Sequence, residues 1–164
     1  MKKTVLIIAA CAATLFGVRA AMAQATDREA LAGLTEVKVA FDITAGDGKG
    51  LLNRLSVIDE TRQSLISQGV KPHFVLAFRG PATRLVQTDQ NLMAPADRPF
   101  AAQIAQKLKD MRAAAGVDSI EQCSVAVRQQ GTKAEHVVPD VKVVGNSWIS
   151  LMAYQAKGYA YIAP

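Results

Sequence analysis

Between residues 37 and 162, the spacing of apolar residues switches repeatedly between the two-residue period of a strand and the three- to four-residue period of a helix. Val37–Ile43 alternates and is rich in β-branched residues. Leucines and isoleucines between residues 51 and 66 then recur along one helical face. His73–Phe78 is a nearly continuous apolar run, typical of a strand buried on both sides. Because neighbouring parallel strands need a crossover connection, this alternation predicts an α/β domain with a mainly parallel sheet covered by helices.

The same alternation continues to the C-terminus. Apolar positions from Phe100 to Met111 predict a helix that ends by Gly116, followed by a short strand at Ser119–Cys123. The remaining predicted elements are a helix at 124–130, a strand at 141–144, a helix at 147–157 and a strand at 159–162. Together these elements predict a five-stranded sheet. A single domain is expected for a chain of this length.

The N-terminus has the three parts of a secretory signal peptide. Lys2 and Lys3 precede an apolar run at residues 5–18, and Ala21-Met22-Ala23 offers the small residues of a cleavage site. The run is shorter than the roughly 20 apolar residues of a membrane span. A retained anchor and a lipid on Cys11, in the middle of the run, are the alternatives. We therefore expect a periplasmic protein with no membrane span after cleavage.

The expected organisation has three parts. Residues 1–23 form the cleaved signal peptide, residues 24–35 a polar, flexible N-terminal arm, and residues 36–164 the α/β domain. Cleavage removes Lys2, Lys3 and Arg19, so the formal net charge of +5 falls to about +2. The remaining charges are interspersed rather than gathered into a stripe, which argues against nucleic-acid binding.

Two short motifs resemble known sites but fail at key positions. The glycine turn at 44–50 has Leu51 where a dinucleotide fingerprint needs glycine or alanine, and it also fails the pattern of a Walker loop. We interpret it as a flexible connection whose backbone N–H groups could hold an anion. Residues 145–149 begin like a nucleophile elbow but have Ile149 in place of the second glycine. Ser147 is instead predicted to cap the following helix.

Removal of the signal peptide leaves Cys123 as the single cysteine. It cannot form an internal disulfide, so it is buried and inert, bonded to another chain, or reactive. Its place at the carboxyl end of a predicted strand, where parallel sheets collect ligands, favours reactivity. His73 and His136 show no zinc-like spacing with Cys123, and we predict neither a metal nor a cofactor.

Three stretches of the sequence resemble the DsrE/DsrF-like family of sulfur-relay proteins, in its exported branch. They are the strand from Gly116 to Cys123, the segment 128–131, and the C-terminal region with Val143–Gly145, Leu151, Gln155 and Gly158–Pro164. The terminal Gly-Tyr-Ala-Tyr-Ile-Ala-Pro is the most distinctive of these. The resemblance covers residues 37–164, nearly the whole expected mature chain.

This resemblance implies a flavodoxin-like, three-layer α/β sandwich that assembles into homotrimers or hexamers. It also implies that Cys123 carries sulfur as a persulfide between donor and acceptor proteins, as a sulfurtransferase-like carrier without independent turnover. A helix starting directly after Cys123 would favour the thiolate, which is the reactive form. Arg128 is five residues further along, about 140° around the helix, so we expect no direct contact with Cys123. The alternative is a non-catalytic module that binds a small ligand or protein and merely packs Cys123.

Overall fold

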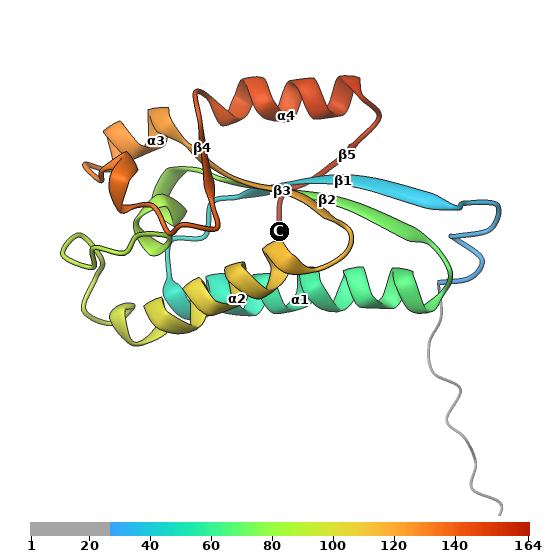
Figure 1. Ribbon diagram of the computed structural model, residues 1–164, viewed down its shortest axis with the longest axis horizontal. Coiled ribbons are helices and arrows are strands. Elements are labelled where there is room, and N and C mark those ends of the chain that lie inside the picture. Colours follow the sequence, from blue (N-terminus) through green and yellow to red (C-terminus); the bar gives the residue numbers. More distant parts are fainter. Residues whose placement is uncertain (1–26) are drawn as a thin grey trace, which may run out of the picture.

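The computed structural model of the protein describes residues 27–164 (Figure 1). The predicted signal peptide and the first residues of the predicted arm lie outside this range. The described residues form a sheet of five parallel strands, in the order β4 (Lys142–Val144), β3 (Val117–Cys123), β2 (Lys71–Phe78), β1 (Glu36–Ile43) and β5 (Ala160–Ile162), with helices on both sides. The predicted three-layer, flavodoxin-like α/β fold is confirmed. Its strand order differs from the 2-1-3-4-5 order of flavodoxin itself, so the likeness lies in the layers and the parallel sheet.

The elements follow the predicted alternation closely. The α-helices are α1 (Gly48–Ser67), α2 (Ala101–Ala113), α3 (Ser124–Gln129) and α4 (Ser147–Ala156). Short 3₁₀ turns, η1 (Gly80–Leu85), η2 (Arg98–Phe100) and η3 (Ala134–His136), lie in the longer connections.

Helices α1 and α2 cover one face of the sheet, and α4 covers the other (Figure 1). Strands β1 to β4 are laid side by side in chain order. The chain then crosses the second face through α4 and pairs β5 with β1 at the opposite edge. Because α4 begins soon after β4 ends, its first residues lie at the carboxyl ends of the strands.

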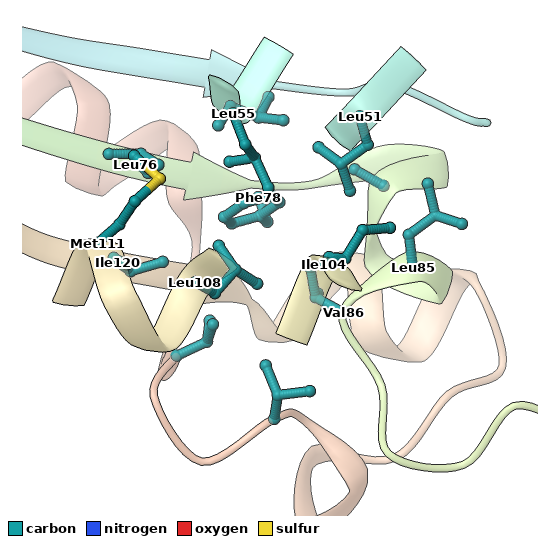
Figure 2. Close-up of a cluster of buried hydrophobic side chains, with 14 of the residues drawn as sticks. Leu51, Leu55, Leu76, Phe78, Leu85, Val86, Ile104, Leu108, Met111 and Ile120 are labelled. Carbon is teal, nitrogen blue, oxygen red and sulfur yellow. The ribbon is translucent and has the colours of Figure 1, made fainter. Parts of the chain in front are cut away.

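The face under α1 and α2 holds the main hydrophobic core. Figure 2 shows Leu76, Phe78 and Ile120 of the sheet facing apolar side chains of both helices. The helical side of this core consists of Leu51, Leu55, Ile58, Ile104, Leu108 and Met111. Each of these side chains is at most 2% exposed, so the helices are held by burial of their apolar stripes.

The face under α4 is built differently, with small and polar side chains. Ala40 and Ala77 form a minor cluster there with Leu151 of α4. Strand β2 is buried on both sides, as predicted, but Val75 and Ala77, rather than larger apolar residues, lie on the α4 side. Small residues let α4 approach the sheet closely and leave room for polar side chains beside them.

The glycine turn after β1 is not the flexible connection that the sequence predicts. Helix α1 begins at Gly48, and the Asp47 side chain caps it by accepting a hydrogen bond from Gly50 N at 2.6 Å. Gly48 N donates to Asp97 Oδ1 at 2.8 Å. A Cβ at Gly50 would lie 2.5 Å from Asp47 Oδ2, which explains the glycine. Because the chain's own carboxylates accept from these N–H groups, the turn is a capped helix start rather than an anion site.

We expect Leu108→Ala to lower the free energy of unfolding by about 2–5 kcal/mol, because it opens a cavity between α2 and the sheet. Leu108 is fully buried in the main core. The control is Ile66→Ala on α1, where the side chain is 46% exposed. Urea denaturation followed by circular dichroism measures both. Equal losses in the two variants would contradict the described packing.

Candidate functional site

Cys123 is the last residue of β3 and stands directly before the first residue of α3. Its side chain is a free thiol, 5% exposed. Cys123 pairs with Val144 of β4 in the sheet, so the ends of β3 and β4 lie side by side. The two helices that follow these strands, α3 and α4, therefore both start close to the sulfur.

The first N–H group of α4 forms a hydrogen bond to Sγ of Cys123, and N–H groups at the start of α3 also influence the thiol. The backbone N–H of Ser147, the first residue of α4, donates to Sγ at 3.3 Å. Burial is the largest single influence on the pKa of the thiol and raises it. The N–H groups of Ser147, Ala126 and Val125, with the Ser147 hydroxyl, lower it by more, so the pKa lies below the ordinary value for cysteine. This arrangement stabilises a thiolate without a neighbouring base.

The cap of α4 differs from the sequence prediction. Asn146, not Ser147, is the N-cap, and its Oδ1 accepts a hydrogen bond from Trp148 N at 2.9 Å. Ser147 is fully buried, and within residues 27–164 its hydroxyl has no hydrogen-bond partner by distance and angle. It nevertheless lies close enough to the sulfur to lower the pKa of the Cys123 thiol. The prediction was wrong by one residue because Asn146 has the extended backbone of an N-cap, whereas Ser147 is already the first helical residue.

A pocket of about 200 Å³ opens over the thiol. Its lining residues come from the end of β3, from the segments that directly follow β2 and β4, and from helices α3 and α4: Arg79, Gly80, Cys123, Val125, Ala126, Gln129, Asn146 and Trp148. Such an edge is the usual ligand position in parallel α/β sheets. Of the lining residues, the sequence had identified only Cys123 as a site residue.

Arg79, directly after β2, is the charged residue of this pocket. Its Nε and Nη2 donate to the two carboxylate oxygens of Asp42, at 2.7 and 2.5 Å. The hydrogen bond to Asp42 raises the pKa of Arg79, which outweighs the opposing effect of burial, so the guanidinium stays charged. Tyr161 donates to the same carboxylate at 2.6 Å, and the Trp148 ring centre lies 5.9 Å from the guanidinium carbon. These contacts hold Arg79 in one orientation.

A second buried carboxylate fastens α4 to the sheet. Glu121, two residues before Cys123, is 3% exposed. It accepts hydrogen bonds from the hydroxyls of Ser119 at 3.0 Å, of Tyr154 at 2.9 Å, and of Ser150. Ser150 and Tyr154 belong to α4, so Glu121 fixes the helix whose first N–H group contacts the thiol. Because side chains in a strand alternate between the two faces of the sheet, the sequence could have suggested that Glu121 and Cys123 lie on the same face. It could not have shown which helix covers that face.

The other residues considered from the sequence lie elsewhere. Arg128 is exposed and its Nη1 donates to Ser124 O at 3.4 Å, and it does not line the pocket, as expected. His73 lies 3.1 Å from Asp118 and 3.7 Å from Glu36 in ion-pair geometry. Within residues 27–164, no three or more His, Cys, Asp and Glu residues are grouped as metal ligands would be. In the same range, no helix is long and apolar enough to cross a membrane.

Comparisons with known proteins support the fold and carry little functional information. No protein-family model matches the chain. An uncharacterized protein from Aquifex aeolicus (strain VF5) is 30% identical over 126 residues, which is 77% of this chain and 55% of that protein. The chain thus spans about half the length of this curated relative.

Among solved structures, the chain is similar to MTH1491, a protein of unknown function from Methanobacterium thermoautotrophicum. The TM-score is 0.60 at 19% identity, over 78% of this chain and 99% of the other. At that identity the likeness concerns the fold alone.

Because donors surround Sγ, we expect the rate of Cys123 alkylation by iodoacetamide to reach half its maximum at a lower pH than that of free cysteine. Ser147→Ala removes only the hydroxyl and should raise this midpoint. Ser147→Pro also removes the N–H, at a helix position that accepts proline, and should raise it further. Ser56→Ala on the exposed side of α1 is the control. A native midpoint at or above that of free cysteine would contradict the described hydrogen bonds.

Glu121→Gln should lower the free energy of unfolding by about 1–3 kcal/mol, because an amide nitrogen cannot accept the hydroxyl protons that the carboxylate accepts. It should also raise the alkylation midpoint of Cys123, since α4 is held less firmly. Glu135→Gln, at an exposed position in η3, is the matched control and should change neither quantity. Denaturation curves and pH–rate profiles measure the two effects. An unchanged pH midpoint of Cys123 alkylation would show that Glu121 does not influence the thiol.

Proposed function

We propose that the protein is a periplasmic, DsrE-like sulfur carrier that holds sulfane sulfur as a persulfide on Cys123. The observation that carries this proposal is the hydrogen bond from the first N–H of α4 to a buried sulfur that also stands directly before α3, with the pKa of the thiol lowered by the N–H groups of both helix starts. A cysteine that is only packed needs no such donors. In a sulfur carrier the sulfur exists as a thiolate and then as a persulfide anion, and hydrogen-bond donors stabilise both anions.

The chemistry is a pair of displacements. The Cys123 thiolate attacks the outer sulfur of a donor hydropersulfide, R–S–SH, and the donor S–S bond breaks. The bonding electrons leave with R–S⁻, and Cys123 becomes Cys–S–SH. An acceptor thiolate then attacks the outer sulfur and regenerates the Cys123 thiolate. Each step is the sulfur analogue of thiol–disulfide exchange and needs no external oxidant or reductant.

The N-terminal sequence supports the periplasmic part of the proposal, through its charged start, apolar run and small-residue cleavage site. Export separates such a carrier from cytoplasmic partners, so its donor and acceptor would themselves be periplasmic.

The outer side of α4 supports the expected homo-oligomer. Trp148, Ile149 and Met152 are each at least 60% exposed, and α4 contains no charged residue. A helix that is apolar on its outward side is typical of a subunit contact. Trimer and hexamer both remain consistent with this patch, which borders the pocket at Trp148.

The burial of Cys123 favours the second candidate function, a ligand-binding module with a packed, unreactive cysteine. The two functions differ in the reactivity of the folded protein. A structural cysteine reacts slowly until the protein unfolds, whereas a carrier thiolate reacts through the pocket.

Incubation with inorganic polysulfide should add sulfur to Cys123, and cyanide should remove it. Cys123→Ser should accept none while retaining its circular dichroism spectrum and thermal midpoint. Intact-mass spectrometry under non-reducing conditions measures the load, and peptide mapping locates it. A Cys123→Ser protein that still loads sulfur, or a native thiol that reacts only after unfolding, would exclude the carrier function.

A further inference from the structure

The wall of the Cys123 pocket presents a fixed cation that the sulfur-transfer step does not use. Asp42 accepts from Nε and Nη2 of Arg79. Tyr161 also lies against the guanidinium, and within residues 27–164 the third nitrogen, Nη1, forms no hydrogen bond by distance and angle. Because Asp42 is 2% exposed and also bound by Tyr161, the guanidinium is anchored from behind and cannot turn freely. Arg79 can therefore donate into the pocket without first losing conformational freedom.

A neutral side chain of the pocket adds a further donor. Asn146 uses its Oδ1 to accept from Trp148 N, which leaves its amide nitrogen as the group able to bind a ligand acceptor. No Asp or Glu lines this pocket in the described part of the chain.

The remaining lining limits the size and character of a ligand. Val125, Ala126 and the Trp148 ring supply apolar surface in the pocket that the thiol and Arg79 also line. A pocket of about 200 Å³ accommodates a few carbon atoms rather than an extended peptide. The pocket thus combines a sulfur nucleophile, a short apolar wall and an anion-binding group.

We propose that this pocket selects small sulfur compounds carrying a carboxylate, with the carboxylate on Arg79 and the reacting sulfur at Cys123. The transfer part of this inference rests on the proposed function, whereas the anion site does not. The donor is a hydropersulfide of a short mercaptocarboxylic acid. The Cys123 thiolate bonds to its outer sulfur, its S–S bond breaks, and the mercaptocarboxylate leaves as the thiolate. Arg79 binds and orients the donor and takes no proton or electron.

Two alkylating reagents of nearly equal size test the anion site without any sulfur transfer. Iodoacetate carries a carboxylate and iodoacetamide is neutral, and both attack the same Cys123 thiolate. The ratio of their rates is therefore independent of the thiolate population. We expect this ratio to exceed that of free cysteine by about tenfold, the effect of one charge-assisted hydrogen bond. A ratio equal to that of free cysteine would overturn the anion site.

Substitution of Arg79 tests whether this residue is responsible. Arg79→Gln should return the ratio to that of free cysteine but leaves Asp42 without its partner. The paired variants Asp42→Asn and Asp42→Asn/Arg79→Gln avoid that difficulty, because the first keeps the cation and the second removes both charges. Only the first should retain the iodoacetate preference. Arg128→Gln is the matched control, since Arg128 is exposed outside the pocket. A preference that survives in the double variant would overturn the role of Arg79.

Hydropersulfides of 3-mercaptopropionate and 2-mercaptoethanol separate this inference from the proposed function. We expect faster loading of Cys123 from the first, and equal rates from the two in the double variant. An iodoacetate preference without loading from either compound would support the anion site and exclude the carrier function. Equal loading from both, with no iodoacetate preference, would support the carrier function and overturn the anion site.

Discussion

The alternation of side chains along a parallel sheet determines how this molecule is built and where its thiol lies. In each strand, successive side chains point to opposite faces, so one face can be filled with large apolar residues and the other with small and polar ones. Phe41, Phe78 and Ile120 lie in the core under α1 and α2. Their neighbours Asp42, Arg79 and Glu121 therefore face α4. The packing that stabilises the domain and the polar groups that surround Cys123 follow from the same alternation.

The α4 face would be unstable if its buried charges were left unpaired, and the structure pairs each of them. Asp42 binds Arg79 and Tyr161, while Glu121 receives three hydroxyl groups. Removing one hydrogen-bond partner of such a buried group destabilises the folded protein. These networks therefore resist changes in the position of α4. Their effect on chemistry is indirect. They keep the first N–H group of α4 on the sulfur, and they keep Arg79 at the pocket wall.

The free thiol is accordingly subject to two opposing influences, burial and hydrogen bonding. Burial alone would keep Cys123 protonated and inert, as in an ordinary hydrophobic core. The donors from α3 and α4 reverse that outcome. This is the physical basis for favouring a sulfur carrier over a packed cysteine. The likeness to the solved structure of MTH1491 supports the fold only, because at 19% identity it carries no functional argument.

The sequence by itself determined the α/β class, the five strands and the position of Cys123 at a strand end, because hydrophobic periodicity is a local property. Only the tertiary structure decided which residues meet the thiol. Arg79 and Ser147 are 44 and 24 residues from Cys123 in the chain, and only the strand order β2-β3-β4 brings them to one edge. The N-cap was misassigned from Asn146 to Ser147 for a related reason. Both residues are good caps locally, and only the folded backbone shows that Asn146 is extended and that Ser147 is already helical.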